Sequence, residues 1–431
     1  MRPSLDRATS RAEAVASQSR ILIIVENLTV PLDRRVWQEA CALRDAGHTV
    51  SVICPTGGAY TERYELLDGI HVFRHPLPLE ADGALGYAVE YSSALFWEAL
   101  LSFKVRARVG FDVIQACNPP DTIFLLARLW RLLAGTRFVF DHHDINPELY
   151  EAKFNKRGVF HKLLLWLERR TFRSADVSIA TNETFRRIAI ARGGMDPSRV
   201  FVVRSLPDRN RFRRIAADPS LKRGRRHLIG YVGIMGAQDG VDLLVKAVDD
   251  LVHRRGRTDV HCAIVGSGTE LEKLQLLARE LKVDDHVTFT GFLSGEPLQR
   301  AFSTFDVGVI PDPKNTYNDK IAMNKVFEYM AIGVPFVAFD LDETRGTAAG
   351  SALYAENNCP RSLADRIGMI IDHPPLAERL AAEGMARSQA LLRWDLERDE
   401  LLKAYQVALA PAASKDLPLP AAPTLQPSLG Q

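Results

Sequence analysis

The chain has 431 residues, of which 46% are hydrophobic, 25% charged and 8% aromatic. This composition is typical of a folded globular protein, and the length predicts two domains, or three. A wholly disordered chain, a collagen-like chain and a small disulfide scaffold are excluded. The sequence contains no run of about 18 apolar residues, so we expect no transmembrane helix. The first twenty residues lack the apolar segment of a secretory signal.

Cysteine usage and charge indicate where the chain works. The five cysteines are widely spaced without a CxxC pair, which predicts a reduced, cytoplasmic compartment and no zinc site. The formal net charge is +2, yet residues 1–230 carry 35 Lys and Arg against 25 Asp and Glu. A basic half favours phosphate-rich partners or an anionic membrane surface. Arginine-rich helices that are simply well solvated are the alternative.

Short apolar runs alternate with helical patterns along most of the chain. We expect strands at 21–27, 49–55, 71–76, 111–118, 137–144, 177–181 and 200–205. A second set follows at 227–233, 261–268, 287–292, 307–312 and 334–341. Between the first two strands, Val36, Ala40 and Leu43 recur at helical spacing. Strands that are apolar throughout and alternate with helices predict an α/β fold with two doubly wound, Rossmann-like parallel sheets.

The two sets of strands divide the chain into domains. We expect an N-terminal domain at 19–206, a polar and basic linker at 207–226, and a C-terminal domain at 227–390. A last helix at 391–410 follows, with packing back on the N-terminal domain as one alternative. The tails 1–18 and 411–431 are predicted to be disordered. Ligands of open α/β sheets bind beyond the strand carboxyl ends, so we expect a site in a cleft between the domains.

The segment 323–339 (MNKVFEYMAIGVPFVAF) carries the strongest local signal. A helix is expected from Asn324, a favoured cap residue, to Gly333, followed by a proline and a buried strand. Asn324, Lys325 and Glu328 share one side of this helix near its start. Free N–H groups at that end suit a diphosphate, and Glu328 is placed to accept hydrogen bonds from a ribose. A surface helix with a Lys325–Glu328 ion pair is the structural alternative.

Polar side chains also end the fifth expected strand, where Asp141, His142, His143 and Asp144 are consecutive. Titratable residues at the carboxyl end of a buried strand mark a site more often than a core. Adjacent histidines point to opposite faces of a strand, so we expect no shared metal ion and predict no metal site.

Two segments, 160–176 and 91–109, are amphipathic and carry both aromatic and basic residues. Basic amphipathic helices with aromatics can lie on an anionic bilayer, which would suit a lipid-linked acceptor. The alternative is that both are ordinary helices facing the core.

Six segments, in this order along the chain, resemble a known family. They are DAGHTVSVICP (45–55), FDHHD (140–144), GYVGIMGAQDG (230–240), IVGSGTELEKL (264–274), VTFTGFLSGEPLQRAFSTFDVGVIPD (287–312) and EYMAIGVPFVAF (328–339). Together they resemble family-4 retaining glycosyltransferases of GT-B fold, most closely the bacterial branch that builds surface polysaccharides. The resemblance spans residues 20–410 and implies two Rossmann-like domains facing across a cleft.

The resemblance assigns roles to residues of the C-terminal domain. Glu328 matches the second glutamate of the family motif and is implied to hold the donor ribose, with Asn324 and Lys325 beside it. Lys320 stands where the first glutamate is found, and Asp319 is a substitute acceptor for sugar hydroxyls. We therefore place Asp319 and Lys320, with His143, in the catalytic set. His143 matches the family histidine that faces the donor sugar.

The remaining candidates line the two sides of the expected cleft. The family's donor loop carries an arginine and a lysine, whereas here only the glycines remain, so backbone amides are expected to hold the phosphate. The candidate donor-binding residues of these loops are Gly233, Gly236, Gln238, Gly240, Gly266, Gly268 and Phe292. Phe292 is either near the nucleobase or in the core. The candidate acceptor-side residues are Arg34, Arg35, Asn118, Asp144 and Glu148.

The expected reaction is transfer of a sugar from a UDP- or GDP-linked donor to a saccharide or polyprenyl-linked acceptor. The resemblance implies retention of configuration, and we expect neither a cofactor nor a metal ion. We do not expect nucleic acid as a partner. We do expect contact with the cytoplasmic face of an anionic membrane. Two alternatives stay open: a nucleotide-sugar epimerase of the same layout, and a non-catalytic nucleotide-sugar-binding protein.

Overall fold

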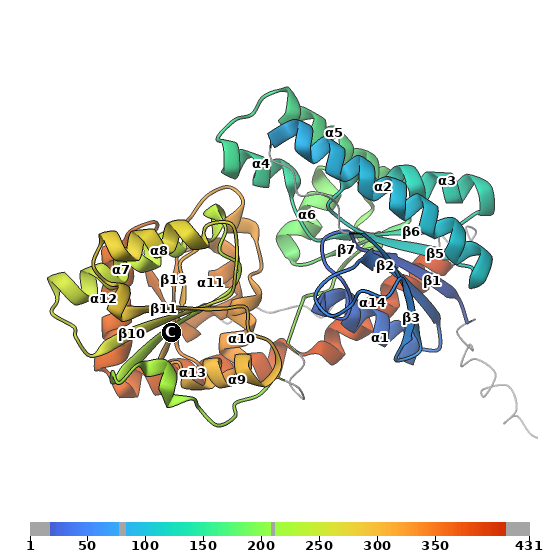
Figure 1. The fold of residues 1–431 in the computed structure, drawn as a ribbon. Coiled ribbons are helices and arrows are strands. Elements are labelled where there is room, and N and C mark those ends of the chain that lie inside the picture. The colour runs from blue at the N-terminus through green and yellow to red at the C-terminus, as the bar shows by residue number, and fades with distance from the viewer. Residues whose placement is uncertain (1–17, 77–82, 208–211, 411–431) are drawn as a thin grey trace, which may run out of the picture.

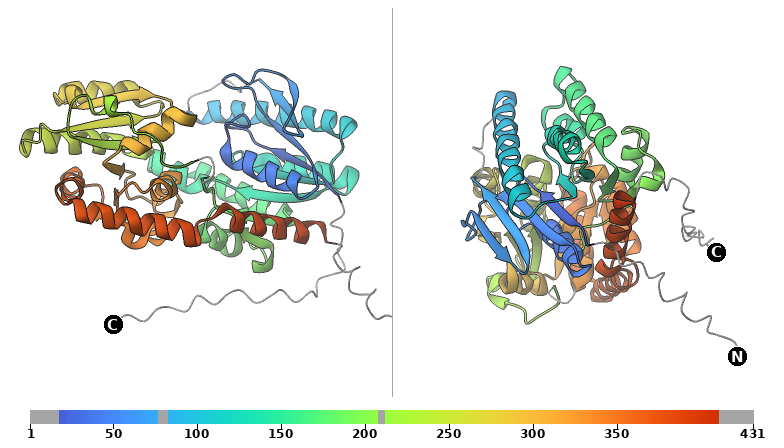
Figure 2. Two further views of the ribbon diagram at one scale, coloured as in Figure 1. Left: turned by 90° about the horizontal axis from the view of Figure 1, so that it is seen from below. Right: turned by 90° about the vertical axis from the view of Figure 1, so that its right-hand side faces the viewer.

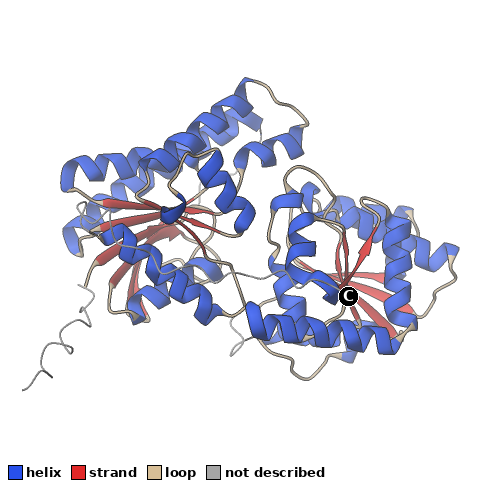
Figure 3. Cartoon of the chain, turned by 180° about the vertical axis from the view of Figure 1, so that it is seen from behind, coloured by secondary structure: helices blue, strands red, loops and turns tan. Residues whose placement is uncertain are grey.

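The computed structural model describes residues 18–76, 83–207 and 212–410, which form two α/β domains side by side (Figure 1). Both are parallel sheets covered by helices on two faces (Figure 3), as the alternating pattern predicts. The predicted tails, apart from residue 18, lie outside the described residues. Among those described, no helix is both long and apolar enough to cross a membrane.

The N-terminal sheet has eight strands in the order β3-β4-β2-β1-β5-β6-β7-β8. Their bounds are β1 (Arg20–Ile24), β2 (Thr49–Pro55), β3 (Tyr64–Leu67), β4 (Ile70–His75), β5 (Val113–Cys117), β6 (Arg137–His142), β7 (Val177–Ala180) and β8 (Val200–Val202). Every pair is parallel except β3–β4. Strand β3 was not predicted, although the Asp68-Gly69 turn that follows it, with both residues at positive φ, is a usual hairpin signal.

Helices cover this sheet in two layers. One face carries α1 (Arg34–Asp45) and α14 (Trp394–Leu409), and the other carries α2 (Gly83–Arg108), α3 (Phe124–Ala134) and α5 (Val159–Ser174). Two shorter helices, α4 (Asn146–Phe154) and α6 (Glu183–Ala191), follow β6 and β7. The three helices of the second layer lie together on one side of the domain (Figures 1 and 2).

The C-terminal sheet has six parallel strands in the order β11-β10-β9-β12-β13-β14. Their bounds are β9 (His227–Val232), β10 (Val260–Val265), β11 (Val287–Gly291), β12 (Val307–Ile310), β13 (Phe336–Phe339) and β14 (Ala352–Ala355). One face is covered by α7 (Val241–Asp249), α8 (Leu271–Glu280) and α12 (Pro360–Asp372), and the other by α9 (Gly295–Thr304), α10 (Asn324–Ile332) and α11 (Asp342–Ala348). The short edge strand β14 was not predicted.

The chain crosses between the domains twice. The described part of the expected linker packs on the C-terminal domain, because Phe212 meets Phe302 edge-on at 5.1 Å and the Ser303 hydroxyl accepts from the Ile215 amide at 3.0 Å. The second crossing joins α13 (Pro374–Leu391), on the C-terminal domain, to α14, and the two helices run end to end (Figure 2, left). Leu401 and Tyr405 of α14 are buried in the core of the N-terminal domain.

Truncating Leu401 tests how far the N-terminal domain depends on α14. Leu401 is fully buried, so Leu401→Ala should lower the free energy of unfolding by about 2–5 kcal/mol, which urea denaturation measures. Leu396 lies on the same helix but is 45% exposed, so Leu396→Ala should change it by only about 0.5 kcal/mol. Equal effects of the two substitutions would show that α14 does not belong to this core.

Candidate active site

Contacts between the two domains gather beyond the carboxyl ends of the central strands. They comprise Arg34 with Glu328 at 2.7 Å, Glu148 with Lys320 at 2.9 Å, Asp144 with Tyr317 at 2.8 Å, Asn182 with the Lys320 carbonyl at 2.8 Å, and Thr184 with Glu343. The N-terminal partners follow β1, β6 and β7, and the C-terminal partners follow β12 and β13. The interface is therefore built at the strand ends, where open α/β sheets place their ligands.

The ion pair between Arg34 and Glu328 joins an exposed side chain of one domain to a buried side chain of the other. Arg34 starts α1, and its side chain is 56% exposed, whereas Glu328 lies one turn into α10 with only 5% of its side chain exposed. A buried carboxylate needs a charged or hydrogen-bonding partner. Here an arginine from the other domain supplies it.

Arg35 turns the opposite way, into the N-terminal domain, and is fully surrounded by acceptors. Its guanidinium donates to Asp141 Oδ1 at 2.8 Å and to the Val203 carbonyl at 2.6 Å, and it lies 3.1 Å from Glu39. Gln115 bridges Glu39 and Asp141, and the Tyr405 hydroxyl donates to Gln115 at 2.5 Å. We call Arg35, Glu39, Gln115, Asp141, His143 and Tyr405 the Arg35 cluster.

Arg35 contacts both Asp141 and Glu39, and the pKa values of these two carboxyl groups move in opposite directions. Burial alone would raise the pKa of Asp141, but Arg35 and His143 hold that pKa well below its ordinary value. Burial raises the pKa of Glu39, and the neighbouring Asp141 charge adds to this. The cluster therefore keeps Asp141 ionised and favours a protonated Glu39.

The neighbouring groups of the Arg35 cluster also set the pKa of His143. Its Nε2 lies 2.7 Å from Asp141 Oδ2 and 2.9 Å from Arg35 Nε. Only one of these contacts is a hydrogen bond in a given protonation state, because Arg35 Nε–H can donate only to an unprotonated Nε2. Burial lowers the pKa of His143, but the Asp141 carboxylate more than offsets this and the pKa lies above its ordinary value. Donation from His143 to Asp141 is thus the favoured arrangement.

The glycine-rich loop after β9 is held by close packing against its neighbours. A Cβ on Gly266 would lie 1.8 Å from the Gly233 carbonyl oxygen, and Gly240, at φ +64°, leaves no room for one beside the Pro311 carbonyl. The Gly236 amide donates to Asp239 at 3.0 Å, and burial raises the pKa of that carboxyl to about 6. The loop therefore already holds one anionic group on a backbone amide.

The chain matches known proteins over both domains. The family description "Glycosyl transferase 4-like domain" fits residues 32–205, and "Glycosyl transferases group 1" fits residues 226–373. The chain belongs to the family-4 glycosyltransferases and has the GT-B fold. The strand order, the two-domain layout and the site at the strand ends agree with this assignment.

Individual relatives of this glycosyltransferase are distant. The alpha-D-kanosaminyltransferase of Streptomyces kanamyceticus is 23% identical over 349 residues, which cover 77% of this chain and 86% of that protein. Sucrose-phosphate synthase from Thermosynechococcus elongatus superposes with a TM-score of 0.71 at 19% identity, covering 90% and 98% of the two chains. HepE from Anabaena, solved in complex with UDP and glucose, gives 0.67 at 16%, covering 90% and 100%.

Lys325, one of the predicted residues of α10, has a partner that the sequence did not reveal. Lys325 does not pair with Glu328. Its amine instead contacts both oxygens of Asp312, at 2.7 and 3.0 Å, in a buried ion pair. The alternative of a Lys325–Glu328 pair is therefore wrong, and the charge of Lys325 is already compensated. Asn324 is exposed at the start of the helix.

The predicted catalytic pair of the 317–320 loop divides between the domains. Lys320 contacts Glu148 across the interface, whereas Asp319 accepts from Lys314 at 3.0 Å and from the Asp342 amide at 2.9 Å. The neighbouring Asn318 donates to the Gln238 carbonyl at 2.9 Å, which joins this loop to the glycine-rich loop. Of this pair, Lys320 contacts the N-terminal domain through its side chain, as Tyr317 of the same loop does through Asp144.

Burial bears on the predictions for Arg35 and Phe292, and hydrogen bonds show the place of Asn118. Arg35 was expected beside Arg34 on the acceptor side, but it is 7% exposed and bound within the Arg35 cluster, so that prediction is wrong. Phe292 is 70% exposed, which rules out the core alternative. Asn118 orders the segment after β6, since its side-chain oxygen accepts from the His143 and Asp144 amides and its amide donates to Asp121.

Several residues of the site were missed. Arg192 holds Glu148 and Glu168 through paired contacts of 2.6–3.1 Å, and it keeps the pKa of Glu148 below its ordinary value against the effect of burial. Tyr317 and Asp312 were missed as well. Asp312 could have been found, because it lies just beyond the carboxyl end of a buried strand, as Asp141 lies near the carboxyl end of β6.

One group of side chains has the composition of a metal site. Single ligand atoms of Cys117, Asp141 and His143 lie within 4.8 Å of one another. The Arg35 guanidinium, a permanent cation, contacts the last two, and burial raises the pKa of the Cys117 thiol well above its ordinary value. A neutral thiol and an arginine in place make these three residues a poor fit to a metal ion.

The charge on His143 can be tested by removing its partner. The Asp141→Asn substitution should bring the pKa of His143 below its ordinary value of 6.5, because burial then acts without a compensating carboxylate. In the wild type the pair contributes stability that is fully present below pH 6.5 and is lost as the pH rises through the higher folded-state pKa.

NMR titration of the histidine ring protons measures this shift. The exposed Asp45→Asn substitution is the control, and it should leave the His143 titration in place. An unchanged titration in the Asp141→Asn protein would mean that another group sets the charge of His143.

Proposed function

We propose that this glycosyltransferase moves a sugar, with retention of anomeric configuration, from a UDP- or GDP-sugar to a saccharide or polyprenyl-linked acceptor. The pathway we propose is cell-surface polysaccharide or glycan synthesis. The observation that carries the donor assignment is Glu328, a buried carboxylate at the family-motif position whose contact across the interface is a half-exposed arginine.

Glu328 is suited to a ribose. In this structure Arg34 pairs with its Oε1, so donor binding requires that pair to separate. The two ribose hydroxyls then donate to the carboxylate and replace the arginine. HepE, a structural neighbour, is described in complex with UDP and glucose, and two mycobacterial relatives are named as GDP-mannose-dependent. Both bases are therefore kept in the proposal.

Arg34 is the cation we assign to the diphosphate. The donor loop 233–240 contains no Lys or Arg, and Lys325 and Lys320 are held by Asp312 and Glu148. Arg34 reaches Glu328 one turn into α10, so its guanidinium is near the start of that helix, where the helix N-terminus also favours an anion. Backbone amides of 236–240 complete the phosphate site after the Asp239 carboxylate leaves the Gly236 amide.

The reaction breaks the bond between the anomeric carbon and the diphosphate oxygen. The acceptor hydroxyl oxygen forms the new bond on the same face of the sugar, and its proton passes to the departing diphosphate. Arg34 and the loop amides stabilise the charge that develops on the leaving group. His143, oriented by Asp141, donates a hydrogen bond to the sugar. Closure of the two domains excludes water, which would otherwise hydrolyse the donor.

The ribose assignment predicts a selective loss of binding. Glu328→Ala should weaken binding of the cognate nucleoside diphosphate about tenfold to a hundredfold, because hydrogen bonds to a charged group are lost. Binding of the 2′,3′-dideoxy nucleotide, which has no ribose diol, should be nearly equal in the wild type and the variant. Calorimetry with UDP and GDP measures both.

The exposed Glu356→Ala substitution in the same domain is the control and should bind like the wild type. A Glu328→Ala protein that retains full affinity for the intact nucleotide would remove Glu328 from the ribose site.

Product analysis tests the reaction itself. Incubation of the cognate donor with an acceptor should give a glycoside of the same anomeric configuration, and turnover should persist in excess EDTA because the cations assigned to the leaving group belong to the chain. NMR of the anomeric proton decides the configuration. An inverted product, a strict requirement for Mn²⁺, or epimerisation of the donor alone would each contradict the corresponding part of the proposal.

A further inference from the structure

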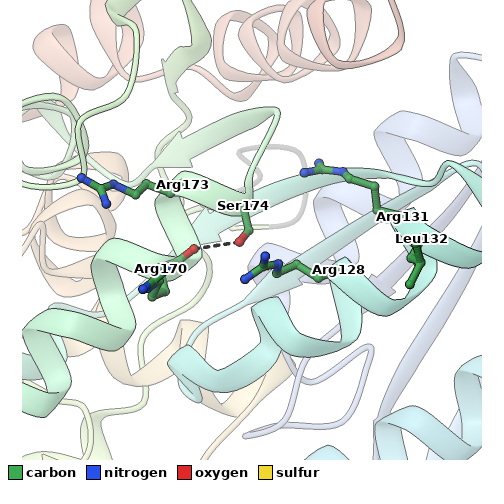
Figure 4. Close-up of a pocket in the computed structure, with 6 residues that line it drawn as sticks. All are labelled: Arg128, Arg131, Leu132, Arg170, Arg173 and Ser174. Atoms are coloured by element: carbon green, nitrogen blue, oxygen red, sulfur yellow. Dashed lines mark hydrogen bonds between the residues drawn. The ribbon is translucent and has the colours of Figure 1, made fainter.

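Four arginines line a cavity of about 540 Å³ between α3 and α5 (Figure 4). Arg128 and Arg131 come from α3, and Arg170 and Arg173 from the last turn and a half of α5. Leu132 and Ser174 complete the lining, and the Ser174 hydroxyl donates to the Arg170 carbonyl at 2.8 Å. The cavity lies in the N-terminal domain and shares no residue with the interdomain site.

The positive charge of this cavity is only partly compensated. Arg131 forms an ion pair with Asp176, and the Arg170 guanidinium lies 5.1 Å above the Trp166 ring. Arg128 and Arg173 form no ion pair with any carboxylate among the described residues. Guanidinium groups that converge on one cavity are the usual means of binding phosphate oxygens, because each offers several fixed donors.

Large apolar side chains surround the arginines on the same helices. Leu132, which lines the cavity itself, is 85% exposed. The other exposed apolar side chains of the two helices are Leu125, Leu129, Leu133, Val159, Leu163 and Trp166. Soluble surfaces leave such side chains scattered, and a group of them beside a positive cavity marks a contact with a partner.

The geometry points to an anionic phospholipid bilayer as that partner, with lipid phosphates bound by the four arginines and the surrounding leucines and Trp166 inserted beneath the headgroups. A bilayer offers phosphate and hydrocarbon within a few ångströms of each other, which matches guanidinium groups beside exposed leucines. A nucleic-acid backbone offers the phosphates without the hydrocarbon. An acidic protein surface would leave the leucines without apolar neighbours.

The position of the surface fits an enzyme that works at a membrane. The α5 helix packs on α4, which carries Glu148 of the interdomain site. Docking of the α3–α5 face thus holds that site beside the bilayer. This consequence rests on the proposed lipid-linked acceptor, whereas the docking itself does not.

Vesicle sedimentation with the full chain tests the proposal. Wild-type protein should bind vesicles of phosphatidylcholine mixed with phosphatidylglycerol and stay free of pure phosphatidylcholine. Arg128→Glu with Arg173→Glu should weaken binding to the mixed vesicles about thirtyfold or more, since each basic side chain near the surface contributes about a factor of five. The matched control is Lys273→Glu with Arg379→Glu, which makes the same change in net charge on the C-terminal domain.

The control protein should bind as the wild type does. A second variant, Leu132→Ser with Leu133→Ser, separates a bilayer from a soluble phosphate. It should lose most of the vesicle binding, and glycerol 3-phosphate at the concentration of accessible lipid phosphate should not release the wild-type protein. Far-UV thermal melting confirms that each variant is folded.

Three results would overturn the proposal. The first is equal loss of binding in the arginine variant and its charge-matched control. The second is release of the wild-type protein by glycerol 3-phosphate together with normal binding of the leucine variant, which would identify a site for soluble phosphates. The third is that the wild type binds no vesicles but forms a dimer in solution, and that the leucine variant is a monomer. This result would mean that a second copy of the chain covers the α3–α5 face.

Discussion

The buried guanidinium of Arg35 is the interaction on which the N-terminal half of the site depends. It neutralises Asp141, which in turn orients and charges His143, and it binds the carbonyl of Val203, where the chain leaves the last strand of the sheet. Through Gln115 the same cluster reaches Tyr405 on α14. Removing one charge of such a buried group leaves the others uncompensated, so His143, the first helix and the C-terminal helix are coupled electrostatically.

The fold could be predicted in detail where strands are buried on both faces. The runs at 21–27 and 261–268 contain the uninterrupted apolar stretches 21–25 and 262–265, and they correspond to β1 and β10. The edge strands β3 and β14 are four residues long and half exposed, so they lack that signal. The helical periodicity of α1 could have predicted that Arg35 is buried and Arg34 is not. Arg35 lies on the same side of α1 as Glu39 and Leu43, which are both buried, whereas Arg34 lies at its edge.

The candidate site was only partly accessible to the sequence because its contacts join distant segments. The motif around Glu328 and the histidine after β6 could be found from local pattern. Arg34, the partner of Glu328, is 294 residues away in the chain, and Arg35, which neutralises Asp141 beside His143, is 106 residues from Asp141, so no local rule indicates either pairing. The absence of cations from the loop 233–240 could be read directly from the sequence. The structure adds that this loop carries a carboxylate, Asp239, bound to the Gly236 amide, and that Arg34 of the other domain pairs with Glu328.

The double crossing of the chain has a consequence for motion. The two connections are tied together, since Glu397 at the start of α14 accepts from both the amide and the guanidinium of Arg204, at 2.7 and 3.0 Å. Two linking segments that are bonded to each other restrict the relative motion of the domains more than a single segment would. Rotation about these tied segments is the motion that can part Arg34 from Glu328 without breaking the Arg204–Glu397 contact.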